Sequence, residues 1–332
     1  MKCLVTGGAG FIGSYVVDLL IEDGYEVVVI DDLSGGFEKN INKKAHFYKI
    51  SLEDMDSKLI KDVEVVYHLA AHAAEGLSVF MPYYNAKKNY MAFMKLVTAC
   101  VENDVKTFVF TSSMAVYGDS HKVPFDEKYL PNPCDPYGVA KASIERLLQI
   151  YSKEFGLNYV ILRLHNVYGI KQNIRDPYRN VIGIFINRLL HGKSPIIYGD
   201  GTQKRAFSHI SDIVPYIVQS AFTKAYYGEV INLGGSIPRT INEVARVVLD
   251  EFGSILEPIY VPPRPCDVKD AYCTVEKSKR LLCFSERADF REETRNTIEW
   301  AKKLKIDEFS YYDKNKYEIK KRMPKTWTEE QI

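Results

Sequence analysis

Several features that mark particular protein classes are missing from this 332-residue sequence. Acidic and basic residues nearly cancel, at a formal net charge of +1, and no basic cluster points to nucleic acid or a membrane surface as a partner. Glycines interrupt the apolar stretch from Cys3 to Ile21, which argues against a signal peptide and a membrane span. The bulk composition therefore excludes these classes, and local motifs must indicate the function.

Cysteine patterns of the disulfide or metal-binding kind are also absent. None of the seven histidines and none of the cysteines has metal-ligand spacing or a C-x-x-C pairing. We therefore expect reduced thiols, no metal ion and a cytoplasmic location. The six cysteines are Cys3, Cys100, Cys134, Cys266, Cys273 and Cys283.

A glycine-rich turn opens the chain. Residues 2–6 are typical of a short buried strand, residues 14–23 have helical apolar spacing, and Gly7, Gly10 and Gly13 lie between them. Glycines at this spacing let a pyrophosphate approach the backbone at the positive end of a helix. The turn therefore predicts a dinucleotide-binding site, with a tight turn that binds nothing as the alternative.

An acidic residue after the second predicted strand specifies the dinucleotide. Residues 26–30 form that strand, and Asp31 follows it about 20 residues after the glycines, at the usual distance for an acid that binds the adenosine ribose. A carboxylate there would repel the 2′-phosphate of NADP. We therefore expect NAD as the cofactor and Asp31, rather than Asp32, as the ribose ligand.

Tyr137 and Lys141 form the most informative pair in the chain, with Ser113 two dozen residues upstream. Side chains four residues apart on a helix share one face, so the Lys141 ammonium can lower the pKa of the Tyr137 phenol toward neutrality. The phenolate would act as a base, and the Ser113 hydroxyl would hold a substrate oxygen. These three residues are the candidate catalytic group for removing a proton from an alcohol while a hydride leaves its carbon.

Predicted strands and helices alternate through the first half of the chain. Such alternation predicts an α/β fold with a Rossmann-type, doubly wound parallel sheet. The expected strands cover residues 2–6, 26–30, 46–50, 64–68, 106–112 and 158–162, and the expected helices cover 11–23, 83–103 and 136–155.

The second half has a less regular pattern, typical of a smaller substrate lobe interleaved with the main domain. A strand at 229–233 is expected to return to the main sheet, and helices are expected at 242–252 and 294–304. We expect a charged and solvated extension at the end of the chain. The predicted division is 1–165 with return elements near 208–235 for NAD, 166–207 and 236–306 for the substrate, and 307–332 for the extension.

Six motifs in the same order resemble those of the extended short-chain dehydrogenases/reductases, in particular the nucleotide-sugar epimerases such as UDP-glucose 4-epimerase. The resemblance covers the chain to about residue 300. The motifs are Thr6–Gly13, His68–Ala71, Ser112–Gly118, Tyr137–Lys141, Arg163–Gly169 and Arg264–Val268.

The resemblance implies roles for further residues. Besides Gly7, Gly10, Gly13, Asp31, Tyr137 and Lys141, the cofactor contacts would be Phe11, Ile12, Leu52, Ala70 and Asn89. The substrate contacts would be Asn166 for the diphosphate, Asn180 and Val181 for the nucleotide, Ile196 and Tyr198 for the nucleobase, and Arg205, Arg264 and Asp267 for diphosphate and ribose. Singly, either arginine could be an ordinary surface ion-pair residue.

Three positions depart from the family pattern. Ser51 replaces an Asp that would bind adenine, Cys266 replaces the Gly of an Arg-Pro-Gly-Asp motif, and His165 replaces an aromatic residue. We interpret His165 as a hydrogen-bonded spacer rather than a proton shuttle. His68, His72 and His209 are interpreted as structural for the same reason.

Among the reactions of this family, 4-epimerisation of a UDP-hexose fits best. Met114 and Ala115 stand where a 4,6-dehydratase would carry an acid/base pair, and neither can move a proton. An epimerase or decarboxylase acting on UDP-glucuronate is the alternative, and a non-catalytic NAD-sensing protein is a further one. Ala271 stands where a small residue would admit a 2-acetamido group, although a shift of one residue would put Tyr272 there.

The resemblance also implies a homodimer. Family members pair through the two long helices, here expected at 83–103 and 136–155. Apolar residues that would suit such an interface, or the core, are Met91, Met94, Leu147 and Ile150.

Overall fold

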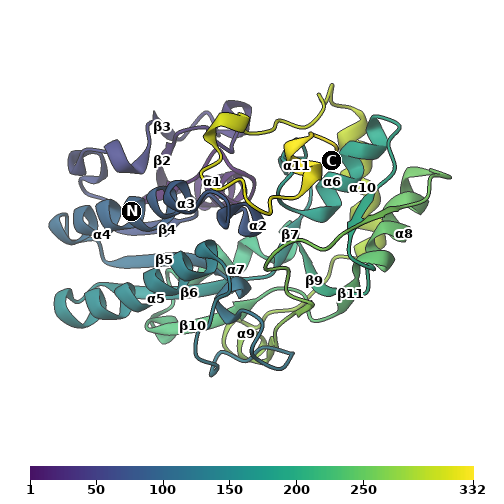
Figure 1. The fold of residues 1–332 in the computed structure, drawn as a ribbon. Helices are drawn as coiled ribbons and strands as arrows, with labels where there is room; N and C mark the ends of the chain where they lie inside the picture. Colours follow the sequence, from purple (N-terminus) through teal and green to yellow (C-terminus); the bar gives the residue numbers. More distant parts are fainter.

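A parallel seven-stranded sheet forms the centre of the molecule (Figure 1), in a computed structural model that describes residues 1–332 except for the side chain of Lys314. The strand order is β10-β6-β5-β4-β1-β2-β3, as expected for a doubly wound fold. The strands are β1 (Lys2–Thr6), β2 (Glu26–Asp31), β3 (His46–Lys49), β4 (Val65–His68), β5 (Thr107–Ser113), β6 (Asn158–Leu164) and β10 (Glu229–Leu233). This confirms the predicted fold class and the return of residues 229–233 to the main sheet.

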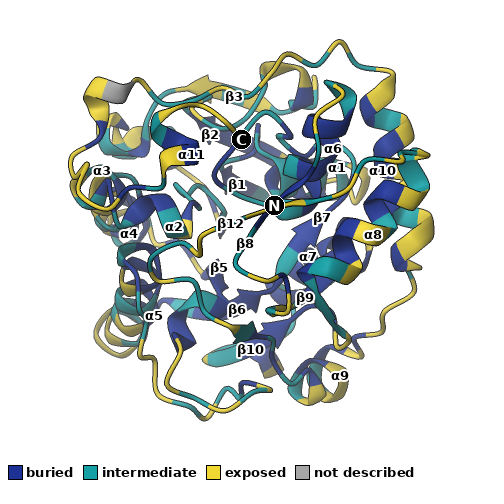
Figure 2. Ribbon diagram, turned by 45° about the vertical axis from the view of Figure 1, so that its right-hand side comes forward, coloured by how far each residue is buried: buried dark blue, intermediate teal, exposed yellow. Residues whose placement is uncertain are grey.

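Helices cover both faces of this sheet. On one face α1 (Phe11–Glu22) and α7 (Val214–Ser220) pack against strand residues such as Val5, and on the other α4 (Ala92–Glu102) and α5 (Pro136–Phe155) pack against residues such as Leu4. Strands covered on both faces have continuous apolar sequences, and the central strands are buried throughout (Figure 2).

One predicted helix is interrupted. Residues 83–103 form α3 (Pro82–Ala86), a π-helical turn (Lys87–Met91) and then α4, where the sequence pattern predicts a single helix. Single π-helical turns often occur at functional sites. The turn buries Asn89 at 2% exposure, beside a loop that follows β4.

The remaining elements form a smaller lobe next to the carboxyl ends of the sheet strands. Helices α6 (Val181–Leu190), α8 (Ile241–Phe252) and α10 (Phe290–Lys302) enclose the apolar core of this lobe. Its strands are β7 (Asn166–Tyr168), β9 (Lys204–His209), β11 (Pro238–Thr240) and β13 (Asp270–Ala271) in one sheet, and β8 (Ile196–Tyr198) with β12 (Ile259–Val261) in another. Short helices α2 (Glu75–Ser78), α9 (Glu276–Leu282) and α11 (Lys325–Thr328) complete the fold.

The end of the chain, residues 307–332, is not the solvated extension that its charge suggests. Trp327 is 1% exposed, and Tyr317, Met323 and Ile332 are also buried. Their partners are Leu77, Phe80 and Tyr178, from both the main domain and the lobe. This C-terminal segment runs across the top of the molecule and ends beside α6 (Figure 1). The prediction of a solvated extension is wrong because apolar side chains between the charged ones are buried in tertiary contacts.

No helix in the described part of the chain has the length and apolar character needed to cross a membrane.

Candidate active site

A cavity of about 450 Å³ lies between the carboxyl ends of the sheet strands and the lobe. In open α/β folds ligands bind at this edge of the sheet. The cavity brings together all but two of the site residues expected from the sequence. Those that line it are Gly7, Gly10, Phe11, Ile12, Gly13, Asp31, Leu52, Ala70, Ser113, Tyr137, Lys141, Asn166, Asn180, Val181, Ile196, Tyr198, Arg205, Arg264 and Asp267.

The glycine-rich turn leaves no space for side chains. A Cβ atom on Gly13 would lie 2.1 Å from the Gly7 carbonyl oxygen, and Gly7 itself has a φ of 73°. The Asp31 carboxylate lies beside the turn, where it accepts hydrogen bonds from the backbone amides of Ala9 (3.0 Å) and Leu33 (2.8 Å). A bare turn at a helix N-terminus with a fixed carboxylate beside it fits a dinucleotide with a free 2′-hydroxyl.

Lys88 is the centre of a polar cluster at the edge of the cavity that contains the glycine-rich turn. Its Nζ atom lies 3.1 Å from Ser51 Oγ, 3.0 Å from Asp32 Oδ2 and 3.3 Å from Glu53 Oε1. Asp32 is therefore an ion-pair partner of Lys88. Ser51, which replaces the acid of the family pattern, belongs to the same polar cluster.

Asn89 does not line the cavity, unlike the other expected cofactor residues. Its side-chain amide accepts a hydrogen bond from His72 N (3.0 Å) and donates one to His72 O (3.3 Å). The His72 residue that it holds does line the cavity. Burial lowers the pKa of His72 to about 4, so this side chain is neutral at pH 7.

Ser113, Tyr137 and Lys141 converge on the cavity from two elements. Ser113 ends β5, and Tyr137 and Lys141 lie one turn apart in α5, which begins where the Asp135 side chain accepts a hydrogen bond from Gly138 N at 2.9 Å. The Lys141 ammonium donates to Thr111 O (2.8 Å) and lies 5.7 Å from the Tyr137 ring centroid.

The electrostatic result differs from the sequence expectation. Burial, together with the negative charge of Glu75, raises the pKa of Tyr137, and the opposing hydrogen bond from Ser113 is weaker. Burial also lowers the pKa of Lys141 to about 7, which reduces its positive charge near neutral pH. The expected lowering of the Tyr137 pKa is therefore wrong for this structure, because desolvation by burial is the largest effect on this group.

Two arginines and an aspartate form a cluster on the lobe side of the cavity. Asp267 Oδ1 lies 3.1 Å from Arg205 Nη2, and Asp267 Oδ2 lies 3.2 Å from Arg264 Nη2. The Arg264 guanidinium lies 4.7 Å from the Tyr198 ring centroid. Cys266 keeps the left-handed φ of 58° that glycine would adopt, so the loop holds its shape despite the substitution. Two guanidinium groups converging on one cavity suit a diphosphate.

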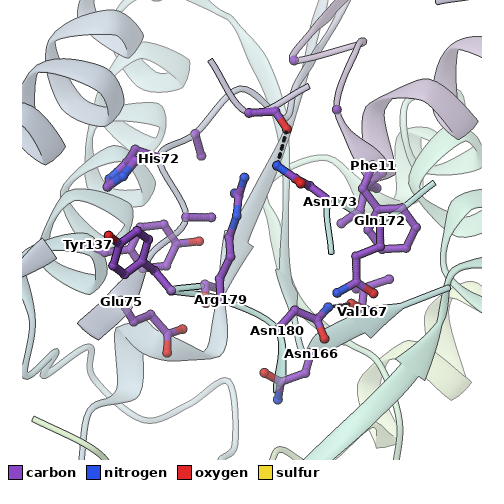
Figure 3. Close-up of a pocket in the computed structure, with 18 of the residues that line it drawn as sticks. Phe11, His72, Glu75, Tyr137, Asn166, Val167, Gln172, Asn173, Arg179 and Asn180 are labelled. Carbon is purple, nitrogen blue, oxygen red and sulfur yellow. Dashed lines mark hydrogen bonds between the residues drawn. The ribbon is translucent and has the colours of Figure 1, made fainter. Parts of the chain in front are cut away.

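Amide side chains from the lobe line the wall opposite Tyr137 and Glu75 (Figure 3). Asn166 Nδ2 donates to Ala206 O (3.2 Å), and Asn180 Nδ2 donates to Val167 O (2.7 Å). Within the described residues, Asn180 Oδ1 and both polar side-chain atoms of Gln172 are buried without a hydrogen-bond partner. Buried polar groups usually have partners, so this wall is suited to a polar ligand.

Comparison with known proteins gives the family. A model of the NAD-dependent epimerase/dehydratase family matches residues 3–234. The chain belongs to this family.

Solved structures of family members have the same fold. UDP-glucose 4-epimerase from Thermotoga maritima, solved with UDP-glucose, is 38% identical with a TM-score of 0.87, over 91% of this chain and 99% of that one. UDP-N-acetylglucosamine 4-epimerase from Methanobrevibacter ruminantium, in complex with UDP-N-acetylmuramic acid, is 38% identical with a TM-score of 0.85, over 90% and 97%. UDP-glucuronic acid 4-epimerase from Bacillus cereus, with UDP-glucuronic acid and NAD, is 32% identical with a TM-score of 0.85, over 91% and 99%.

Ala271 lies outside the main cavity of this family member. It lines a neighbouring side cavity of about 50 Å³ together with Met114, Ala115 and Glu75. Tyr272 is not among the described residues that line either cavity. One part of this recess has small or apolar side chains, and charged residues, among them Glu75, Asp135 and Arg205, line the rest. Glu75 lines both cavities.

Many lining residues were not among the site residues expected from the sequence. Glu75, Arg179 and Ile332 are three of them, and the first two are charged. The only sequence signal for Glu75 is an acid within the apolar run that follows β4. Nothing in the sequence pattern indicates that Ile332 reaches the cavity, because the contact depends on the whole path of the C-terminal segment.

Proposed function

We propose that this protein catalyses the NAD-dependent 4-epimerisation of a UDP-hexose through a transient 4-keto sugar. The observation that carries the proposal is one cavity with a dinucleotide-type turn, the Ser113–Tyr137–Lys141 group and an arginine pair along its walls. The protein also shares its fold with a UDP-glucose 4-epimerase and a UDP-N-acetylglucosamine 4-epimerase, each 38% identical in sequence.

The residues divide the chemistry among them. When bound, NAD supplies the acceptor for the hydride of sugar carbon 4. In its phenolate form, which the positive charge of a bound nicotinamide ring nearby would favour against the effect of burial, Tyr137 takes the proton of the 4-hydroxyl group. Ser113 holds the same oxygen as alcohol becomes ketone. Lys141 fixes the nicotinamide ribose beside Tyr137. The sugar then turns over in the cavity, and Tyr137 returns the proton to the oxygen after the opposite face of the ketone is reduced.

The nucleotide diphosphate would stay fixed while the sugar turns. Arg205 and Arg264 bind the diphosphate, Asp267 orients both guanidinium groups and binds the ribose, and Asn166 and the backbone at Asn180 and Val181 complete the clamp. Ile196 and Tyr198 bound the nucleobase. Binding energy far from carbon 4 thus holds the substrate through both half-reactions. On this proposal residues 1–165 with 208–235 bind NAD, and residues 166–207 and 236–306 bind the nucleotide sugar.

An enzyme that acts on UDP-glucuronate is the second candidate. The Bacillus cereus structure favours it, because a uronate epimerase shares this fold. A decarboxylase has less support, since Met114 and Ala115 offer no acid or base beside Ser113.

We also propose a cytoplasmic homodimer. All six cysteines are free thiols, which suits a reducing compartment. Met91 on the π-helical turn and Ile150 on α5 are 56% and 42% exposed, respectively, on the two helices that would pair. Light scattering of the protein and of Ile150→Glu tests this, and a monomer in both cases would contradict it.

Proton NMR of the purified protein with UDP-glucose or UDP-N-acetylglucosamine, without added NAD, tests the proposed reaction. We expect the 4-epimer of one or both sugars. Release of carbon dioxide and a UDP-pentose from UDP-glucuronate would instead assign the decarboxylase, and no turnover of any UDP-sugar would contradict the proposed function.

A further inference from the structure

We propose that Glu75 selects uncharged sugars and rejects uronates, an inference that rests on the proposed function. Glu75 begins α2 and lines both the main cavity and the side cavity that contains Ala271. It lies on the same wall as Tyr137, where carbon 4 would react (Figure 3).

The Glu75 carboxylate accepts no hydrogen bond from the described residues of the protein, and it acts on its neighbours only through its charge. Its side chain is exposed because it faces the cavity. A carboxylate held in this way can accept a hydrogen bond from a sugar hydroxyl or an acetamido N–H group.

The charged groups around Glu75 do not cancel its charge. Asp135 at the start of α5 and Asp267 oppose its ionisation, whereas Arg205 and Arg264 favour it. Although solvent reaches Glu75 through the cavity, desolvation by the surrounding protein is the largest effect and raises the pKa of Glu75 to about 7. Tyr137 and Cys134, which also face it, are neutral groups whose pKa values are themselves raised. The arginines would be engaged by the diphosphate when a substrate binds.

Because the sugar turns over during the reaction, the charge of Glu75 can discriminate between substituents on carbon 5. Carbons 3 and 5 flank carbon 4, so the two orientations of the ring present opposite edges to the wall that carries Tyr137 and Glu75. In one orientation the substituent of carbon 5 faces Glu75. A hydroxymethyl group can donate a hydrogen bond there, while a uronate carboxylate would meet a like charge in a partly desolvated site.

The side cavity gives the same residue a second role. A 2-acetamido group would fit beside Ala271, with its N–H directed toward the Glu75 carboxylate. The substrate class that fits is therefore a UDP-hexose or UDP-N-acetylhexosamine without a carboxylate on the sugar.

Calorimetric binding of UDP-glucuronate and UDP-glucose to the purified holoenzyme tests this inference independently of turnover. We expect the ratio of their dissociation constants to be at least tenfold in favour of UDP-glucose at pH 8. This preference should shrink at least tenfold in Glu75→Gln. Glu127→Gln changes a half-buried carboxylate that lines neither cavity and should keep the wild-type ratio.

The wild-type protein alone provides a second measurement. Because protonation removes the charge of Glu75, the preference of the wild-type protein for UDP-glucose should weaken as the pH falls from 8 to 6. The preference of Glu75→Gln should not change over this range. An unchanged ratio in Glu75→Gln, equal pH dependence in both proteins, or binding of neither sugar nucleotide would overturn the inference. Proton NMR in parallel records 4-epimerisation, so loss of the proposed function is seen separately from loss of selectivity.

Discussion

The glycine-rich turn and the C-terminal segment border the same cavity, but they are held in place differently. The turn between β1 and α1 owes its shape to neighbours in the chain, such as the hydrogen bond from Gly10 N to Gly7 O at 3.0 Å. The C-terminal segment owes its position to distant partners: Glu318 accepts hydrogen bonds from Tyr83 N and Tyr84 N, both at 2.8 Å, about 235 residues earlier.

Those distant contacts join the two halves of the molecule. Glu318 satisfies amides at the N-terminus of α3 in the main domain, and Thr326 Oγ1 lies 2.7 Å from Tyr198 Oη in the lobe. Trp327 packs edge-on against Phe80 and Tyr178, one from each side. The comparison therefore separates a turn shaped by local contacts from a segment that packs against both the main domain and the lobe.

The largest effect is expected at Tyr137, which lies outside both regions but lines the cavity that they border. Tyr137→Phe removes the proton acceptor while keeping the buried ring, so the epimerisation rate should fall by about 10²–10⁴-fold. Retained NAD and the melting temperature should stay near wild-type values. Single-turnover kinetics with UDP-glucose measures the loss, and a rate within tenfold of wild type would remove Tyr137 from the mechanism.

A graded pair of substitutions tests the turn. The Cβ of Gly13→Ala would lie 2.1 Å from the Gly7 carbonyl oxygen, whereas that of Gly10→Ala would lie 3.1 Å from the same atom. We expect Gly13→Ala to lose its retained NAD and Gly10→Ala to lose much less. Chromatography of the nucleotide released on denaturation measures both, and equal retention would show that close backbone approach does not control binding.

The difference between local and distant contacts also explains which features could be predicted from the sequence. The strand–turn–helix at residues 2–22 and the Tyr137–Lys141 spacing depend on local periodicity. The sheet was therefore predicted correctly, and all but two of the expected site residues line one cavity. Glu75 was not, because its importance comes from Asp135, Arg205 and Arg264, which lie far along the chain. The direction of the Tyr137 pKa shift was also missed, since burial is a tertiary property.

The C-terminal segment was mispredicted for a related reason. Tyr317, Met323 and Trp327 follow neither a helical nor a strand period, and charged residues separate them. Only the folded main domain and lobe provide the apolar surface that buries them.

Removing the central ring of the C-terminal segment should weaken substrate binding. Trp327→Ala deletes a fully buried indole, a change that costs about 3–5 kcal/mol of packing. We expect partial detachment of the segment, at least a tenfold rise in KM for the UDP-sugar, and little change in retained NAD. Ile319→Ala alters a side chain 43% exposed in the same segment and serves as the control. An unchanged KM in Trp327→Ala would mean that the segment stabilises the fold without shaping the cavity.

The smallest expected effect concerns a hydrogen bond between this segment and Tyr198 of the proposed nucleobase wall. Thr326→Val keeps the shape of the side chain but removes the hydroxyl that lies 2.7 Å from Tyr198 Oη. A net loss of about 1 kcal/mol is typical for one such bond, so KM should rise about fivefold while kcat is unchanged. Thr328→Val is the matched control, because the Thr328 hydroxyl donates only to Lys325 O in its own turn. If both variants raise KM equally, the effect comes from the segment as a whole; if only Thr326→Val does, the segment acts on the cavity through Tyr198.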